Sequence, residues 1–273
     1  MTTPGIAPSS HPPTATTSRI HGRFLWHELL ARDIAAAQAF YPKVVGWTMS
    51  AMPLPQGGAY TIFEMDGMGR AGAMQYPAEA CAAGAPARWV PYMGSDDVDA
   101  TCRAAAALGA TIQMPPTDMP EVGRMAMLHD PEKAPFYVFK PIPAGTLEQA
   151  PVAGEFAWHE LASDDPERAL DFYQRLFGWE RLHAMDMGTD GMYQMFGRGA
   201  FTYGGMMRRS AGMPAPTWSS YIRVADLDRA MIALKEAEGK IVMGPHEVPN
   251  DDLIVVAEDN QGAVISFVGT KQK

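Results

Sequence analysis

Two short stretches place a histidine beside a glutamate, a pairing that suits metal binding or acid–base chemistry. The residues Trp-His-Glu-Leu occur at 26–29 and again at 158–161. Histidine nitrogens and carboxylate oxygens bind divalent metals, and a carboxyl group with a raised pKa can act as a general base. The candidate side chains are His27 and Glu28 in the first stretch and His159 and Glu160 in the second.

Both stretches belong to an internal duplication that covers most of the chain. Residues 24–47 align on 156–179 without a gap, and eleven of these 24 positions are identical. A repeat of about 130 residues is far longer than the units of a solenoid and has the size of a domain. The Pro- and Ala-rich stretch between the copies is typical of a linker. We therefore predict an N-terminal tail at 1–21, a first domain at 22–140, a linker at 141–153 and a second domain at 154–273.

Each copy shows the same order of elements twice: a strand, a helix and three more strands. In the first copy, an apolar run at 24–31 precedes Asp33 and a helix-like segment that ends at Gly46. Aspartate is a preferred residue before the first turn of a helix, and glycine is preferred just after the last turn. The pattern predicts an α+β fold of four βαβββ modules. The predicted caps are Asp33, Asp97, Asp164 and Asp226.

The composition restricts the class of partner. The chain has 273 residues, 47% of them hydrophobic, and a formal net charge of −9. An acidic chain without Lys/Arg runs is a poor partner for nucleic acid, and no apolar run approaches the ~18 residues that span a membrane. The first 18 residues lack the basic start and apolar core of a signal peptide. With only Cys81 and Cys102 present, we expect free thiols and a cytoplasmic protein.

The pattern D-x-x-x-A-x-x-F-Y-x-x-x-x-G-W at 33–47, followed later by D-P or D-N turns at 130 and 259, resembles the vicinal oxygen chelate superfamily. That superfamily includes glyoxalase I, extradiol dioxygenases, and fosfomycin and bleomycin resistance proteins. The chain most resembles the tandem two-domain glyoxalase-like proteins of bacteria, over residues 22–140 and 154–270. The resemblance implies that two modules form one open barrel per domain, with a ligand or metal on its concave inside.

The resemblance also implies where metal ligands would lie, and these positions hold unsuitable residues. The superfamily's enzymes bind one divalent metal through His, Glu or Gln side chains on the first, fifth and last strands. The residues at these positions are Trp26, Val90 and Tyr137 in the first copy and Trp158, Ser219 and Ser266 in the second. We therefore predict no metal cofactor. The alternative is a divalent metal held by relocated ligands, namely His27, Glu28, His159 and Glu160.

Strand alternation separates the histidines from the glutamates. Neighbours on a strand point to opposite faces, so in the register that the resemblance implies Trp26 and Glu28 face the cavity, whereas His27 faces a helix. A ligand role for His27 would require a one-residue slip, such as a β-bulge provides. Each glutamate has two open interpretations: a carboxylate bonded to a neighbouring Tyr, Arg or backbone N–H, or a ligand acceptor or general base. Arg223 would pair with Glu160 or clamp a substrate.

The function that these residues predict is binding of a small planar or aromatic molecule in metal-free cavities. The predicted lining consists of Trp26, Tyr92, Tyr137, Trp158, Ser219, Tyr221 and Arg223. The alternative is a divalent-metal-dependent lyase, isomerase or dioxygenase. Enzyme status stays open, because Glu28 or Glu160 alone could move a proton. A single functional copy with the other as scaffold, and a monomer with paired domains or a homodimer, are further alternatives.

Overall fold

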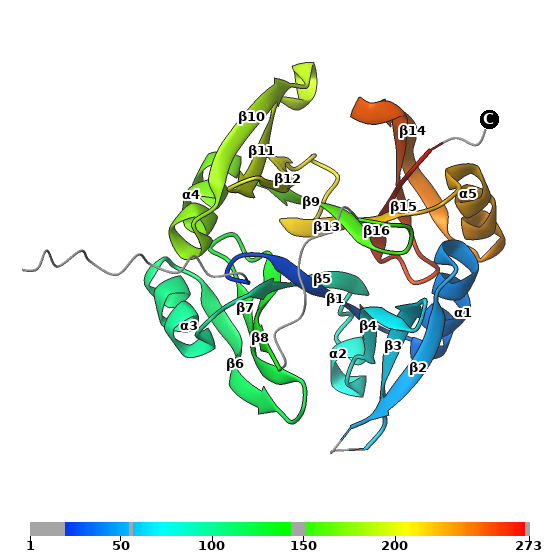
Figure 1. Ribbon diagram of the computed structural model, residues 1–273, viewed down its shortest axis with the longest axis horizontal. Helices are drawn as coiled ribbons and strands as arrows, with labels where there is room; N and C mark the ends of the chain where they lie inside the picture. The colour runs from blue at the N-terminus through cyan, green and yellow to red at the C-terminus, as the bar shows by residue number, and fades with distance from the viewer. Residues whose placement is uncertain (1–19, 55–56, 143–150, 271–273) are drawn as a thin grey trace, which may run out of the picture.

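The computed structural model describes residues 20–54, 57–142 and 151–270 and arranges them as two halves of the same design (Figure 1). We call residues 20–142 the first half and residues 151–270 the second half. The first half contains β1 (Phe24–Ala31), α1 (Ile34–Val45), β2 (Thr48–Pro53), β3 (Ala59–Met65), β4 (Met68–Gln75), α2 (Ala78–Ala82), β5 (Arg88–Gly94), α3 (Val98–Ala107), β6 (Thr111–Met119), β7 (Gly123–His129) and β8 (Pro135–Pro141). The second half contains β9 (Phe156–Ser163), α4 (Pro166–Phe177), β10 (Glu180–Asp186), η1 (Gly188–Asp190), β11 (Met192–Arg198), β12 (Phe201–Arg208), β13 (Thr217–Arg223), α5 (Leu227–Glu236), β14 (Lys240–Val248), η2 (Pro249–Asp251), β15 (Asp252–Glu258) and β16 (Val264–Gly269).

Each half forms one eight-stranded mixed sheet. The strand orders are β2-β3-β4-β1-β5-β8-β7-β6 and β10-β11-β12-β9-β13-β16-β15-β14. The first strand of each module pairs in parallel with its last strand, and the two modules of a half meet where β1 runs antiparallel to β5 and β9 to β13. The predicted α+β fold of paired βαβββ modules is confirmed, and each described sheet stays open at its edge strands. Most of the predicted tail and linker lies outside the described residues.

The helix ends follow the residue types that mark them. The Asp33 side chain accepts a hydrogen bond from the Ala36 N–H, and α1 ends at Gly46 with φ of 87°. Helix α4 differs from the prediction by one residue, because its cap is Asp165 rather than Asp164. Pro166 at the first helical position explains the shift, since proline is favoured there and Asp165 then precedes it. Asp164 pairs with Arg209 instead.

The outer strands of each sheet curve away from the other half, so the two concave faces, of which the first also carries the short helix α2, point in opposite directions (Figure 1). We call these the inner faces. On the opposite side of the sheets, α1 lies beside α5 and α3 lies beside α4, so each helix pair joins one half to the other. The hydrophobic cores follow the same division. One core combines residues such as Phe40 and Trp89 with Leu227 and Phe267, and the other combines residues such as Phe136 with Tyr173.

The two tryptophans of the repeated Gly-Trp pair hold the halves together. Trp47 Nε1 donates to the carbonyl oxygen of Gly154 at 3.0 Å, and Trp179 Nε1 donates to that of Gly22 at 2.7 Å. Both glycines have positive φ, and a Cβ at Gly22 would lie 2.8 Å from Phe177 Cβ. A residue with a side chain would therefore be strained in its backbone and would collide with the other half.

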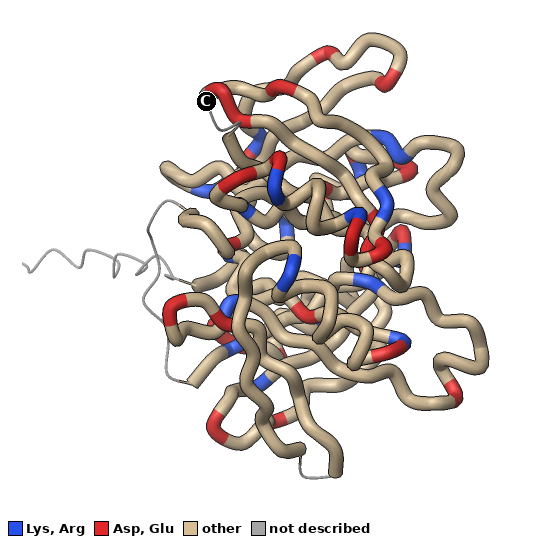
Figure 2. The backbone as a smooth tube through the Cα atoms, turned by 90° about the vertical axis from the view of Figure 1, so that its right-hand side faces the viewer, with Lys and Arg blue, Asp and Glu red and all other residues tan. Residues whose placement is uncertain are grey.

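Polar contacts add to this junction. Tyr41 donates a hydrogen bond to Asp259 at 2.9 Å, and in the same way Tyr173 donates to Asp130 at 3.0 Å. Arg70 of the first half also pairs with Glu155 of the second. Elsewhere, acidic and basic residues are intermingled over both halves (Figure 2). Among the described residues, no helix has the length and apolar character needed to cross a membrane.

Candidate functional site

The repeated Trp-His-Glu-Leu stretch lies on the central strands β1 and β9, and its residues alternate between two environments. Trp26 and Leu30 belong to an apolar cluster on the inner face, together with Tyr92 and Tyr137. Leu29 instead belongs to the core that the helices cover. Trp26 thus lies on the face where the cavity was predicted. Strand alternation thus puts Glu28 on the inner face and His27 on the opposite one.

Glu28 is a buried carboxyl group surrounded by tyrosines. Its side chain is on the inner face, and the residue is only 2% exposed. Burial raises the pKa of Glu28, while hydrogen bonding to Tyr137, Tyr60 and Tyr92 acts in the opposite direction. Its Oε2 atom is buried and has no hydrogen-bonding partner among the described residues. A buried acceptor without a donor is uncommon, because such an oxygen loses its bonds to water.

Tyr60 reaches Glu28 because the neighbouring strand carries no side chain in its path. Gly72 on β4 pairs with Glu28 in the sheet, and a Cβ at Gly72 would lie 1.8 Å from the Tyr60 hydroxyl. Trp26 Nε1 donates a hydrogen bond to the same hydroxyl at 2.9 Å. Tyr92 and Tyr137 lie on the other side, where their rings stack with centroids 4.1 Å apart.

The second half repeats this arrangement around Glu160. Trp158 Nε1 donates to the Tyr193 hydroxyl at 2.6 Å, and Tyr193 donates to Glu160 Oε1 at 2.7 Å. Tyr221 donates to Glu160 Oε2 at 2.6 Å, so both carboxylate oxygens have a partner. Burial raises the pKa of Glu160, and these two tyrosine bonds oppose that effect. Glu160 is thus a carboxylate bonded to neighbouring tyrosines, which is the first of the two interpretations given for the glutamates.

The two inner faces differ in polarity. Ser266 occupies the position of Tyr137, and the hydroxyls of Ser219 and Ser266 lie 3.2 Å apart. The predicted pairing of Arg223 with Glu160 is wrong, because Arg223 forms a salt bridge with Asp252 at 2.7 Å. The reason is position along the strand: Ser219 is the residue that pairs with Glu160, and Arg223 lies four residues farther on, at about 3.3 Å per residue.

His27 and His159 contact each other across the junction of the halves. Their Nε2 atoms are 2.9 Å apart, and both rings are buried. Each imidazole stacks on a phenylalanine of the other half, His27 on Phe156 and His159 on Phe24, with ring centroids 3.6 Å apart in both cases. The register that the resemblance implies predicts a helix over His27. A strand of the second half covers it instead, which a single repeat cannot reveal.

The hydrogen bonds assign the protons of this pair. His159 Nδ1 lies 3.1 Å from the carbonyl oxygen of Tyr203, which can only accept, so Nδ1 carries the proton. The Nε2 of a neutral His159 is then an acceptor, and His27 Nε2–H donates to it. Burial and the neighbouring ring hold the pKa of His27 well below its usual range, and burial lowers the pKa of His159 to about 3. Both rings are therefore neutral at pH 7.

The divalent metal that the resemblance implies does not fit the described residues. Glu28 and Glu160 are the carboxyl groups at the centres of the two inner faces, and the described groups around each are tyrosine hydroxyls, which ionise only at high pH. His27 and His159 bind each other on the far side of the sheets, so neither can share a metal with Glu28 or Glu160. Within residues 20–54, 57–142 and 151–270, no group of three His, Cys, Asp or Glu residues is placed to hold a metal ion.

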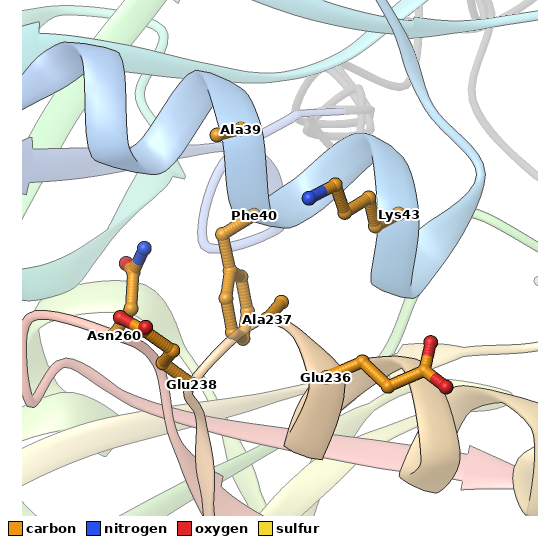
Figure 3. A pocket seen from close by; sticks show the side chains of 7 residues that line it. All are labelled: Ala39, Phe40, Lys43, Glu236, Ala237, Glu238 and Asn260. Carbon is orange, nitrogen blue, oxygen red and sulfur yellow. The ribbon is translucent and has the colours of Figure 1, made fainter.

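A separate pocket of about 200 Å³ lies between α1 and α5 (Figure 3). Neither Glu28 nor Glu160 lines it. Phe40 of α1 and Ala237 stand at its centre, with the charged side chains of Lys43, Glu236 and Glu238 around them. None of the predicted site residues lines this pocket. It marks a place where the two helices are incompletely packed.

Tyr60 and Tyr193 are the two site residues that we did not predict. They occupy matching positions of the duplication and alternate on their strands with residues of the opposite face, and each contacts the glutamate of its own half. The spacing of the repeat therefore contained the signal. The glycines under their rings, Gly72 and Gly205, were a second signal, because a glycine within a strand often marks a close approach of another group.

Comparison with known proteins supports the relationship that the repeat indicated. The Glyoxalase/Bleomycin resistance protein/Dioxygenase superfamily matches residues 23–136 and 155–267. The anthracycline biosynthesis protein DnrV of Streptomyces peucetius is 29% identical over 265 residues, which are 90% of this chain and 93% of that protein. The putative glyoxylase CFP32 of Mycobacterium bovis is 40% identical over 129 residues, 47% of this chain and 48% of that protein.

Solved structures show the same fold at low sequence identity. The 2,3-dioxygenase LapB from Pseudomonas sp. KL28 superposes with a TM-score of 0.63 at 12% identity, covering 93% of this chain and 94% of that one. The Mn(II)-bound glyoxalase from Novosphingobium aromaticivorans superposes with a TM-score of 0.60 at 16% identity, covering 93% and 83%. With a family match over both halves, the chain belongs to the Glyoxalase/Bleomycin resistance protein/Dioxygenase superfamily.

Proposed function

We propose that the protein binds a small planar aromatic molecule on the inner face of its first half, without a metal ion to hold it. The observation that carries this proposal is the stacked pair of Tyr92 and Tyr137 beside Trp26, with the buried carboxyl group of Glu28 among them. Flat aromatic side chains bind a flat ligand by stacking and by excluding water from both surfaces.

The first half suits an apolar ligand better than the second. Partly buried methionines surround its aromatic residues, and flexible Met side chains adapt to ligands of different outline. These methionines are Met74, Met114, Met125 and Met127. In the second half, Ser219 and Ser266 replace Val90 and Tyr137. The anthracycline biosynthesis proteins, which match nearly the whole chain, also favour a polycyclic aromatic ligand, because anthracyclines are polycyclic aromatic compounds.

Calorimetric titration with 2-methoxyanthraquinone, a planar three-ring probe, tests the proposal. We expect one probe to bind per chain. Tyr137→Ser gives the first half the residue that the second half has at this position, and it should bind the probe at least about tenfold more weakly. A stacked aromatic pair contributes about 0.5–1.5 kcal/mol in addition to the effect of its buried area. Ser266→Tyr, in the second half, is the matched control and should leave the affinity of the first-half site unchanged. Absence of binding, or an affinity that Tyr137→Ser leaves intact, would contradict the proposal.

The metal-dependent alternative has its own test. Protein purified without chelator is analysed for bound metal and then titrated with Zn²⁺, Ni²⁺, Mn²⁺ and Fe²⁺. One carboxyl group surrounded by tyrosine hydroxyls should give no tight stoichiometric binding. Tight binding of one or two ions per chain that Glu28→Gln or His27→Ala removes would favour the lyase or dioxygenase alternative instead.

A further inference from the structure

The two repeated glutamates have different hydrogen-bond partners although their strands and neighbours match. Glu160 accepts a bond at each oxygen, from Tyr193 at 2.7 Å and from Tyr221 at 2.6 Å. Glu28 lies among three tyrosines but keeps a buried Oε2 without a partner among the described residues. The pair therefore provides an internal comparison, in which one carboxyl group is saturated by the protein and the other is not.

The difference follows from one substitution between the copies. Tyr221 faces Ser266 and is free to direct its hydroxyl at Glu160. The matching Tyr92 instead stacks on Tyr137, with ring centroids 4.1 Å apart. Tyr92 and Tyr137 both lie near Glu28, yet no described tyrosine hydroxyl bonds Oε2. The same substitution thus builds an aromatic surface and leaves an acceptor open beside it.

An open acceptor in a buried site is a favourable position for a donor from outside the chain. A buried oxygen that lacks a partner has lost its water and regains a hydrogen bond only when a donor arrives. Three tyrosines surround this carboxyl group and favour its ionised form, in which both oxygens are acceptors, and Oε2 has no donor among the described residues. The Trp26 N–H is already used by Tyr60 at 2.9 Å, which leaves the Trp26 ring as a stacking surface. A flat ligand with a hydroxyl group on its edge would complement both the Trp26 ring and the open Oε2 atom.

Building on the function proposed above, we propose that Glu28 anchors the aromatic ligand by accepting a hydrogen bond from a ligand hydroxyl at Oε2, whereas Glu160 serves only the structure of the second half. The ligand class is then a phenol or hydroxyquinone rather than an unsubstituted aromatic hydrocarbon. The assignment also distinguishes two residues that the sequence presents as equivalent.

The test compares two probes that differ only in the donor, 2-hydroxyanthraquinone and 2-methoxyanthraquinone, by calorimetry at pH 6. Wild-type protein should bind the hydroxyl probe at least about tenfold more tightly, as expected for a hydrogen bond to a charged or strongly polar group. Glu28→Met should remove this preference, so that the two probes bind the variant with equal affinity. Glu28→Gln should reduce it, because an amide oxygen is a weaker, neutral acceptor. Glu160→Gln is the matched control and should keep the full preference.

The outcomes separate this inference from the proposed function. If both probes bind wild-type protein equally, or if Glu160→Gln removes the preference and the Glu28 variants keep it, the role of Glu28 is overturned while aromatic binding stands. If neither probe binds, the proposed function fails and this inference fails with it. Circular dichroism and urea unfolding establish that each variant is folded before titration, and the near-isosteric Glu28→Gln provides a folded variant if Glu28→Met is too unstable.

Discussion

Gly205 is a position where a single added carbon atom should disturb the Glu160 site. A Cβ there would lie 2.1 Å from the Cζ atom of Tyr193, whose hydroxyl bonds both Trp158 and Glu160. The ring must move, and a buried carboxyl group then loses a donor. We predict that Gly205→Ala lowers the free energy of unfolding by about 2–4 kcal/mol, measured by urea denaturation.

The matched control is Gly212→Ala, because a Cβ at Gly212 meets nothing within 4 Å and its φ is not positive. This variant should stay within about 0.5 kcal/mol of wild type. Equal stabilities of the two variants would show that Tyr193 does not lie across Gly205.

The histidine pair should make stability depend on pH in mildly acidic solution. Both folded-state pKa values lie below the unfolded value of about 6.5, so the stabilising effect is complete above pH 6.5. Below that pH the unfolded chain binds protons that the folded chain does not. Stability should fall toward pH 3 by about 1.4 kcal/mol per pH unit for each such proton.

Comparison of variants isolates this contribution from that of the buried carboxyl groups. The amide of a His27→Gln variant keeps a donor for His159 but does not titrate. Between pH 6.5 and 4, the free energy of unfolding of this variant should therefore fall less steeply than that of wild type, by up to about 1.4 kcal/mol per pH unit. Urea midpoints at half-unit pH steps measure it. A slope identical to that of wild type would mean that His27 is protonated in the folded protein.

Strand alternation predicted the faces of individual residues but not what covers them. The sequence placed Trp26 on the inner face and His27 on the other, since side chains alternate whatever lies above them. That His27 would meet His159 was not predictable from one repeat, because the contact depends on how two sheets pack. Arg223 was assigned to Glu160 from its face alone, and its position along the strand instead places it beside Asp252.

At the scale of elements, a turn of the first half caps a helix of the second. Glu132 accepts hydrogen bonds from the Ser163 hydroxyl and from the backbone N–H groups of Asp164 and Asp165, at 2.6, 2.9 and 3.0 Å. In the matching turn, Gln261 accepts one bond, from the N–H of Asp33 at 2.7 Å. Helix starts have free N–H groups, and a carboxylate also interacts favourably with the helix dipole.

We predict that Glu132→Ala lowers the free energy of unfolding by about 1–2 kcal/mol, in the range of lost helix caps. Gln261→Ala, which removes one neutral acceptor, should cost less than half as much. Glu132→Gln should recover part of the loss. Urea denaturation at pH 7 measures all three, and an equal cost for the alanine variants would contradict the importance of the charge and of the additional bonds.

The element order was predictable because capping residues and alternating apolar residues act locally. Asp33 and Gly46 mark the ends of α1 where they were expected. The contact of α1 with α5 and of α3 with α4 was not predictable, since helix faces alone do not identify their partners. The site was predicted in part, because Glu28 and Tyr92 were named from their faces and Tyr137 from the last-strand position that the resemblance implies, whereas Tyr60 approaches from another strand across a glycine.

At the scale of the whole molecule, neither half has a hydrophobic core of its own on the helix side. Each core draws on both halves, and Phe24 and Phe156 reach across to the aromatic residues of the other half. We predict that residues 20–142 and 151–270, expressed separately, are insoluble or unfolded, because each exposes a large apolar surface. Co-expressed, they should form a soluble complex, measured by co-purification and circular dichroism. A folded, monomeric half would contradict the shared cores.

The covalent union of two near-symmetric halves removes a restriction that a homodimer would face. In a dimer of identical chains, a substitution appears on both sides of the two-fold axis and alters both sites at once. Here Tyr137 stands on one side and Ser266 on the other, and the junction through His27 and His159 is intact. One inner face can therefore change its chemistry while the other keeps the saturated glutamate that supports the sheet. The two halves keep matching contacts at their junction, and the residues that differ on their inner faces allow the two sites to differ in chemistry.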